Sequence, residues 1–324
     1  MSKQAVHNML NRYLKNQEMQ EQLSYLIFKI RKDHPSMCMR SMYYKIQPDG
    51  MGRDKFEAFC KALGLKSKRW RNYTKTTDSN GVIRFDNLIE GLIVKRLNQA
   101  WVSDITYFEV GGRFYYITFI MDLFSRRILG WQVSKSLRTS DTTLPALRQA
   151  LKIRKNEIPV GLIFHSDGGG QYYCKEFLDI TNQYEMCNSM CEAAWENGAA
   201  ERVNGTIKNN YLKFYEIKDY QMLIKKTDRA VHLYNHEKPH KSLHYLTPVN
   251  FEQNWISKSQ LARKEDKPVA FGFRSFGSHR ASKKVKQKTG EAKATPAIIS
   301  TFSSAATLSL TSYSPAEPVS FSSC

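Results

Sequence analysis

Three carboxylates stand in surroundings that suit chemistry better than solvation. Asp104 interrupts the apolar run VSDITY, Asp167 ends another in FHSDGG, and Glu201 lies among small residues in NGAAERVNG. Strand alternation places Asp104 on the same face as Val102 and Thr106. Acidic side chains from two strands and a helix could converge on a pair of Mg²⁺ ions, which take oxygen ligands and share them with phosphates. Such a pair can activate the attacking oxygen and stabilise the leaving oxygen of a phosphoryl transfer.

Each carboxylate also has a local explanation. Asp104 could hydrogen-bond within its strand, Asp167 could begin a tight turn because Asp and Gly are favoured there, and Glu201 could be a surface residue. The spacing alone leaves both interpretations open. On a helix, however, Glu201 shares one face with Asn204, Gly205 and Lys208. On this face Glu201 could bind metal, Asn204 could make a polar contact, and Lys208 could contact a phosphate.

The stretch FHSDGGGQYY, residues 164–173, ends an apolar run with a carboxylate and three glycines. Glycine lets a ligand approach the backbone closely. We therefore expect the strand to present Asp167 to metal and the glycines to let a large anionic ligand approach the backbone.

The surrounding pattern predicts an α/β fold. WVSDITYFEV, RFYYITFIMD and RRILGWQVS read as three strands, the first two joined by a hairpin at Gly111-Gly112. A helix from Asp141, a buried strand from Val160 towards Asp167 and helices over 175–184 and from about 198 follow. Consecutive strands and then alternating helix and strand indicate a mixed sheet.

The first 75 residues predict an all-helical, helix-turn-helix-like DNA-binding region. Apolar spacing indicates a helix over 1–32, and shorter ones over 39–46 and 53–63 flank the turn QPDGMG, with Gly64 as C-cap. The segment KSKRWRNYTK follows directly. Its cations are predicted to contact phosphates: Lys66, Lys68, Arg69 and Arg71.

Charge is distributed unevenly along the 324 residues. Residues 1–100 carry a net +10, residues 101–256 a net +2 and residues 257–324 a net +7, within a total of +19. A nearly neutral centre between two basic arms favours a catalytic body held on nucleic acid. No apolar run has the length of a membrane span, no signal peptide is apparent, and six cysteines without a CxxC pair indicate reduced, cytosolic thiols. We expect a cytoplasmic, nucleoid-associated protein.

These observations divide the chain into four parts. They are a helix-turn-helix-like region over 1–75, a linker over 76–97, a catalytic core with a C-terminal helix over 98–255, and a basic then Ser/Thr-rich disordered tail over 256–324.

Five motifs occur in the order of a known family. They resemble motifs of the OrfB-type catalytic subunit of insertion-sequence transposases, in the family named after insertion sequence three. The motifs are WVSDITYF, MDLFSRRILGW, HSDGGGQY, ENGAAERVNGTIK and YNHEKPHKSLHYLTP. The resemblance covers about residues 1–255. It implies an RNase H-like, integrase-type core and a DDE triad at Asp104, Asp167 and Glu201, which would bind two Mg²⁺ ions, replaceable by Mn²⁺.

The resemblance also implies an activity and its partners. The family hydrolyses a DNA strand at the transposon end, and the freed 3′-hydroxyl then attacks another phosphodiester. We expect double-stranded DNA as terminal repeat and target, a homo-oligomer, and an upstream-frame helix-turn-helix partner or fusion. Phosphate contacts are expected from His165, Gln171, Asn204 and Lys208.

The sequence departs from the family in three places. The interval between Asp167 and Glu201 is shorter than usual, which leaves Glu192 and Glu196 as rival third ligands. Three glycines replace the more usual single glycine, and Lys238 replaces arginine in the closing block 234–248, which we expect to be structural. Two other functions stay open: a DNA-binding remnant without catalysis, and an RNase H-like nuclease without strand transfer.

Overall fold

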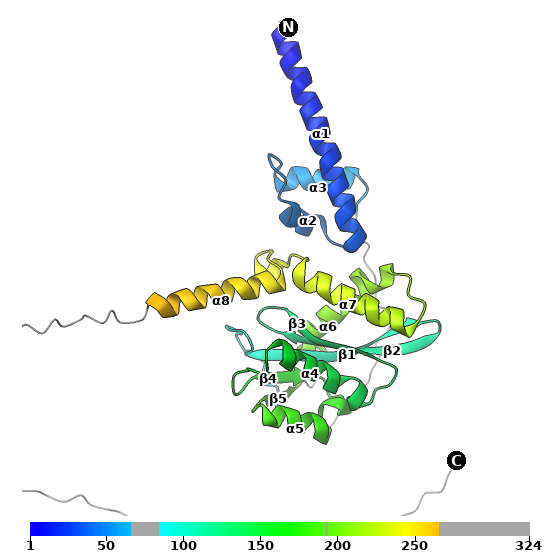
Figure 1. The fold of residues 1–324 in the computed structure, drawn as a ribbon, viewed down its shortest axis with the longest axis vertical. Coiled ribbons are helices and arrows are strands. Elements are labelled where there is room, and N and C mark those ends of the chain that lie inside the picture. The colour runs from blue at the N-terminus through cyan, green and yellow to red at the C-terminus, as the bar shows by residue number, and fades with distance from the viewer. Residues whose placement is uncertain (66–83, 192–193, 266–324) are drawn as a thin grey trace, which may run out of the picture. The chain divides into compact units, whose positions relative to one another are not determined.

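The computed structural model describes residues 1–65, 84–191 and 194–265. Its N-terminal region consists of α1 (Lys3–Asp33), α2 (Met39–Ile46) and α3 (Arg53–Ala62) (Figure 1). The three helices share a small apolar cluster that lies at the C-terminal half of α1: Leu23, Ile27, Met37, Met42, Phe56 and Cys60. The predicted helices are confirmed, and Gly64 ends α3 with φ +73°. The predicted phosphate-contacting cations Lys66, Lys68, Arg69 and Arg71 lie outside the described residues.

The core is built on a five-stranded mixed sheet. Its strands are β1 (Ala100–Val110), β2 (Arg113–Asp122), β3 (Ile128–Ser134), β4 (Ile163–Ser166) and β5 (Cys187–Met190), in the order β3-β2-β1-β4-β5. β1, β2 and β3 pair antiparallel, and β4 and β5 run parallel to β1. Gly111 and Gly112 both have positive φ, as the two-residue hairpin between β1 and β2 requires. This strand order and direction define an RNase H-like sheet, as predicted.

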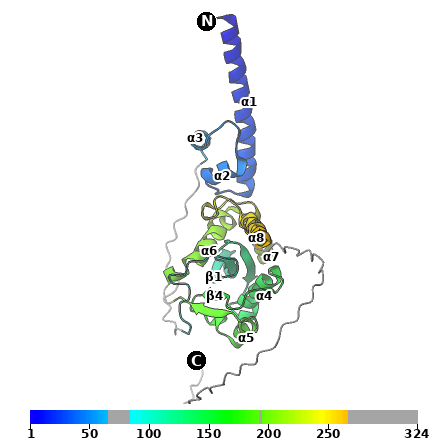
Figure 2. The ribbon, with the colours of Figure 1, turned by 90° about the vertical axis from the view of Figure 1, so that its left-hand side faces the viewer.

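Helices cover both faces of the sheet (Figure 1). α4 (Thr143–Ile153) and α5 (Lys175–Gln183) share one apolar cluster with the sheet, and α6 (Gly198–Asn210) and α7 (Tyr220–His236) share the other. Figure 2 shows α4 and α6 on opposite sides of β1. α8 (Pro248–Glu265) follows, and short 3₁₀ turns lie at Thr139–Asp141, Gly170–Tyr172, Ala194–Asn197, Leu212–Phe214 and Lys241–Leu243.

Gly130 sets how closely α4 approaches the sheet. A Cβ atom at this position of β3 would lie 2.0 Å from the carbonyl oxygen of Ala146 in α4. Because that neighbour is backbone and cannot rotate away, only glycine fits.

Three parts of the core differ from the sequence predictions. The buried strand begins at Ile163 rather than Val160, whose side chain is 68% exposed before a turn at Gly161. The strand β5 was not predicted, because its residues CNSM show no apolar run. α8 extends to Glu265, so residues 256–265 are helical rather than tail; their strong helix formers (Gln, Leu, Ala, Arg, Lys, Glu) explain the extension.

The described part of the predicted linker is also tied to the core. The backbone nitrogen of Met190 donates to the Asp86 carbonyl, and that of Leu88 donates to Ser189 Oγ at 2.9 Å. Residues 86–88 therefore lie along β5 instead of forming a free connection. Among the described helices, none has the length and apolarity to cross a membrane.

Candidate active site

The register of two parallel strands brings Asp104 and Asp167 together. Val102 of β1 pairs with His165 of β4, and each aspartate lies two residues further along its strand direction. The two side chains therefore leave the same face of the sheet at neighbouring positions. Both are half-buried. The alternation in β1 and the apolar run of β4 were the sequence signals for the positions of these two aspartates.

Helix α6 supplies polar partners to the β1 side of this pair. Asn204 Nδ2 donates to Asp104 Oδ2 at 2.7 Å, and Lys208 Nζ donates to Thr106 Oγ1 at 2.6 Å. Asn204 and Lys208 are one helical turn apart, and Asp104 and Thr106 are two residues apart on the strand. The helix and strand periods thus match, as the sequence predicted for this face of α6.

The electrostatics of Asp104 reflect burial beside other acids. Burial raises its pKa, the charge of Asp167 raises it further, and the charge of Glu201 adds to both. Hydrogen bonds from the Ile105 backbone and Asn204 oppose these effects, and the resulting pKa is about 7. Burial also raises the pKa of Asp167. The site therefore gathers carboxylates whose charges raise the pKa of Asp104, and Lys208 is a cation that interacts with Asp104.

Glu201 is exposed on the first turn of α6, and its charge raises the pKa of Asp104. The rival Glu196 lies in the 3₁₀ turn before α6, and its Oε2 accepts a hydrogen bond from Asn87 Nδ2 at 2.9 Å. The charge of Glu196 influences His165 and Cys191. Glu192 lies outside the described residues. Of the described candidates, Glu201 is the acid whose charge acts on Asp104.

The glycines after Asp167 make room for side chains of the site itself. A Cβ at Gly169 would lie 3.1 Å from Asp167 Oδ1, and one at Gly168 would lie 2.8 Å from Met190 Cε. The Gly169 backbone nitrogen donates to Asp167 Oδ1 at 3.2 Å, and Tyr173 Oη donates to the Asp167 carbonyl at 2.7 Å. The first contact holds the carboxylate, and the second holds the backbone of Asp167. Only a Cβ at Gly170 would meet open space.

The predicted phosphate contacts have different surroundings. His165 is fully buried, and its Nδ1 lies 2.9 Å from Ser189 Oγ. A histidine near the end of a strand carries no signal of such burial, and a contact from His165 to DNA stays a prediction. Gln171 is half-buried in the loop after Asp167. Asn204 and Lys208 are engaged with β1 as described above.

Sequence reasoning missed Asn197 as a site residue. Its Nδ2 donates to the Ser103 carbonyl at 2.9 Å, which ties the start of α6 to β1 beside Asp104. The Ser103 hydroxyl also lies 2.9 Å from Tyr172 Oη. The position of Asn197 directly before Gly198 at the start of a helix was the available signal.

The donor set is composed of oxygen atoms, which suits a hard divalent cation. Asn204 Oδ1 is buried beside Asp104 and has no hydrogen-bond partner among the described residues. Within the described ranges, no three His, Cys, Asp or Glu side chains are close enough to hold one ion together. Asp104 and Asp167 therefore form a pair, with Glu201 at its edge.

Comparisons with known proteins agree with this geometry. Two models described as integrase core domain match residues 95–194 and 185–248. A protein of insertion element IS600 from Shigella sonnei, described as an uncharacterized 31 kDa protein, is 29% identical over 63% of this chain and 76% of its own. A putative transposase for IS986/IS6110 from Mycobacterium tuberculosis is 30% identical over 50% of this chain and 60% of its own. Transposase InsF for IS3fB from Escherichia coli is 28% identical over 47% of this chain and 53% of its own.

A solved structure of the HTLV-2 integrase catalytic core domain in complex with magnesium is 21% identical, covers 48% of this chain and 95% of its own, and has a TM-score of 0.40. The sheet order and the domain matches define the chain as a protein with an integrase core domain. The chain is similar to transposases of insertion sequences, among them one of insertion sequence IS3.

Proposed function

We propose that this protein cuts and joins DNA at the ends of its insertion sequence, with Asp104, Asp167 and Glu201 as the acidic triad. The observation that carries the proposal is the β1–β4 register, which places two half-buried aspartates side by side with Glu201 close enough to raise the pKa of Asp104. Carboxylates gathered in this way repel each other, and a divalent cation would remove that repulsion.

The metal expected here is Mg²⁺, held by Asp104 and Asp167 with Glu201, and with Mn²⁺ as a substitute. A pair of such ions would lower the pKa of the attacking water or hydroxyl and stabilise the leaving oxygen. The protein's own residues keep the site in order. Asn204 holds one oxygen of Asp104 through a 2.7 Å hydrogen bond, and Lys208 places a cation one helical turn further on, within reach of a phosphate.

The chemistry is two successive displacements at phosphorus. In the first, a water oxygen bonds to phosphorus, the bond to the 3′ oxygen breaks, and a proton passes to that oxygen to give a 3′-hydroxyl. In the second, this hydroxyl bonds to the phosphorus of another strand and releases a second 3′-hydroxyl. Neither step needs an oxidant or a covalent link to the protein.

The proposed partners follow from this substrate. They are double-stranded DNA, as terminal repeat and as target, and further copies of this chain, because two ends must be cut together. α2 and α3 would serve as a helix-turn-helix that contacts DNA, and an upstream-frame partner or fusion would assist. A protein with this substrate would act in the bacterial cytoplasm.

Strand cleavage on a labelled duplex that carries the element's terminal repeat tests the proposal. Wild type is expected to release a 3′-hydroxyl only with Mg²⁺ or Mn²⁺, Asp167→Asn and Glu201→Gln to lose this activity, and Glu196→Gln to retain it. If the losses follow Glu196→Gln instead of Glu201→Gln, the third ligand is wrong. Binding without cutting, even with the upstream partner present, would favour a DNA-binding remnant. Cutting without joining would favour a nuclease.

A further inference from the structure

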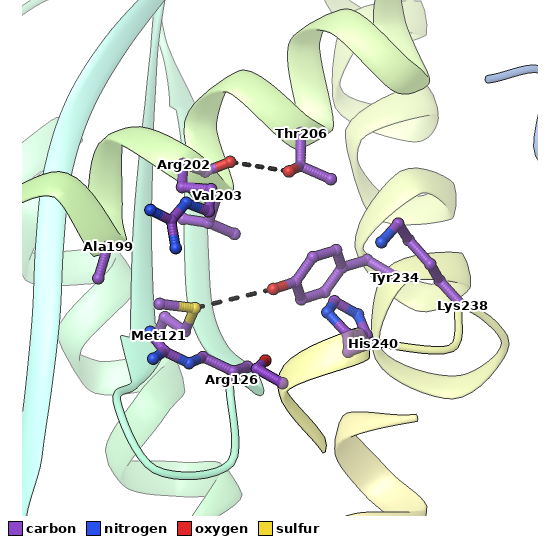
Figure 3. A pocket seen from close by; sticks show the side chains of 10 residues that line it. Met121, Arg126, Ala199, Arg202, Val203, Thr206, Tyr234, Lys238 and His240 are labelled. Atoms are coloured by element: carbon purple, nitrogen blue, oxygen red, sulfur yellow. Dashed lines mark hydrogen bonds between the residues drawn. The ribbon is translucent and has the colours of Figure 1, made fainter. Parts of the chain in front are cut away.

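A second polar site lies on the other side of α6. A pocket of about 150 Å³ opens between the β2–β3 turn, α6 and the segment that follows α7 (Figure 3). Three cations line this basic pocket, Arg126, Arg202 and Lys238, together with the polar side chains of Thr206, Tyr234 and His240. No acidic side chain is among its described lining residues.

Within the described chain none of the three cations forms an ion pair, although the charge of Asp122 acts on Arg126. Arg127, the neighbour of Arg126, lies 2.6 Å from Glu252. Burial lowers the pKa of Arg126 and of Lys238, and the charge of Arg202 lowers that of Arg126 further. Cations collected without an acid destabilise the fold unless a ligand balances them.

The pocket also contains a polar atom that folding leaves unused. His240 is 9% exposed, and its Nε2 is buried without a hydrogen-bond partner. Burial and the charges of Lys238 and Arg126 lower the pKa of this histidine to about 3, so its ring is neutral. Tyr234 Oη makes one weak contact, with Met121 Sδ at 3.8 Å (Figure 3). Because the other ring nitrogen hydrogen-bonds to the Tyr234 backbone, the neutral Nε2 accepts rather than donates, and the donors for an anion are Arg126, Arg202 and Lys238.

Helix geometry connects the basic pocket to the candidate active site. Ala199, Arg202, Val203 and Thr206 line the pocket and recur at the spacing of one helical face. Asn204 and Lys208 lie on another face and contact β1. One helix therefore presents its cationic side to the pocket and its other side to Asp104.

We propose that the basic pocket binds a phosphate group, supplied by the DNA that is cut at the neighbouring acidic site. Arginine and lysine with hydroxyl donors match the oxygens of a phosphate, and phosphate contacts of this kind position DNA without reading its sequence. The volume is several times the roughly 30 Å³ that one water occupies in the liquid. That DNA supplies the phosphate rests on the proposed function. That the pocket binds an anion does not depend on the proposed function.

The salt dependence of DNA binding by the full chain tests the DNA source. Removing one interaction between a protein cation and a DNA phosphate should reduce the slope of log K against log salt by about 0.9. Lys238→Gln is expected to reduce the slope by about that amount. Lys238→Arg, which keeps the charge, and Lys152→Gln, which removes an exposed charge from α4 on the opposite face of the sheet, should leave it unchanged.

A second measurement separates DNA phosphate from free phosphate. Inorganic phosphate, added at constant ionic strength against chloride, should raise the melting temperature of wild type and of Lys238→Arg but not of Lys238→Gln. Without phosphate, Lys238→Gln should melt no lower than wild type, because it removes an unpaired cation; a lower melting temperature would indicate a structural role.

The outcomes are distinct. An unchanged slope together with phosphate-dependent stabilisation would keep the anion site and overturn DNA as its source. An unchanged slope without stabilisation would overturn the pocket altogether. If wild type fails to bind the terminal repeat, the proposed function fails, and the phosphate titration still decides the pocket.

Discussion

Two clusters of buried carboxylates in the core differ in what balances them. Glu252 of α8 is 2% exposed and accepts hydrogen bonds from Arg127, Arg154 and Ser125. Burial alone would raise its pKa, but the bonds and charges of Arg154 and Arg127 lower it overall. Asp104 is also surrounded by protein, yet burial and the charge of Asp167 raise its pKa to about 7.

The difference separates a structural cluster from a ligand site. At Glu252 the chain supplies the opposite charges itself, so the cluster is complete once the protein folds. At Asp104 the chain supplies further negative charge, and the basic pocket has the reverse composition, with cations and no acid. Both incomplete sites adjoin α6, which is where a metal-bound phosphodiester would complete them.

The largest expected effect is on activity at the incomplete cluster. Asp104→Asn should reduce cleavage of the terminal repeat by roughly 10³-fold or more, since removing a metal ligand forfeits several kcal/mol of transition-state stabilisation. In metal-free buffer its melting temperature should equal or exceed that of wild type, because an unbalanced charge has gone. A substantial fall in melting temperature would show that the aspartate pair is structural.

The complete cluster should respond in the opposite way. Glu252→Gln leaves Arg127 and Arg154 without their shared carboxylate and should lower the free energy of unfolding by about 3–5 kcal/mol, measured by urea denaturation. Glu216→Gln is the control, because Glu216 pairs with Lys218 on the surface, where both side chains are exposed, and should change stability by less than about 1 kcal/mol. Equal effects of the two changes would remove the distinction.

The pH dependence sharpens the same contrast. The pKa of Glu252 is lower in the folded protein than its ordinary value of 4.5. Its charge therefore contributes stability above about pH 4.5, and the contribution is lost as the pH falls through the folded-state pKa. We expect the stability difference between wild type and Glu252→Gln to be constant from pH 7 to pH 5 and to shrink below that. A difference that stays constant down to pH 3 would contradict the lowered pKa.

A smaller effect is expected at Asn204, which positions Asp104. Asn204→Ala removes a hydrogen bond to a charged group, worth about 1.5–3 kcal/mol, and should reduce cleavage by roughly tenfold to a hundredfold. Because the carboxylate would lose its orientation, the Mg²⁺ concentration needed for half-maximal cleavage should rise. A lower rate at an unchanged metal requirement would exclude this positioning role.

The sequence predicted most of the fold because the spacing of apolar residues is clear in helices and strands that bury only one face. The alternation in β1 fixed the face of Asp104, and apolar spacing located α2 and α3. Sequence prediction failed where contacts with residues distant in the chain determine the local structure. β5 has no apolar run and exists because β4 offers a parallel edge, and Val160 is apolar but lies before the turn at Gly161.

For the candidate site, the sequence indicated the three acidic residues and the face of α6 with Asn204 and Lys208, but not the burial of His165 or the basic pocket. Asp104, Asp167 and Glu201 carry their own local motifs. The burial of His165 depends on Ser189 from β5, a strand that the sequence did not reveal. The basic pocket collects residues from β2–β3, α6 and the end of α7, which only the folded chain brings together.

The close approach at Gly130 has a consequence for judging related copies of this element. Any other residue at position 130 would push α4 away from the sheet, so a copy could retain Asp104, Asp167 and Glu201 and still lose the packing of α4 on the core. A survey that scores copies as intact by these acidic residues alone would count such a copy as intact. Position 130 should therefore be checked together with Asp104, Asp167 and Glu201.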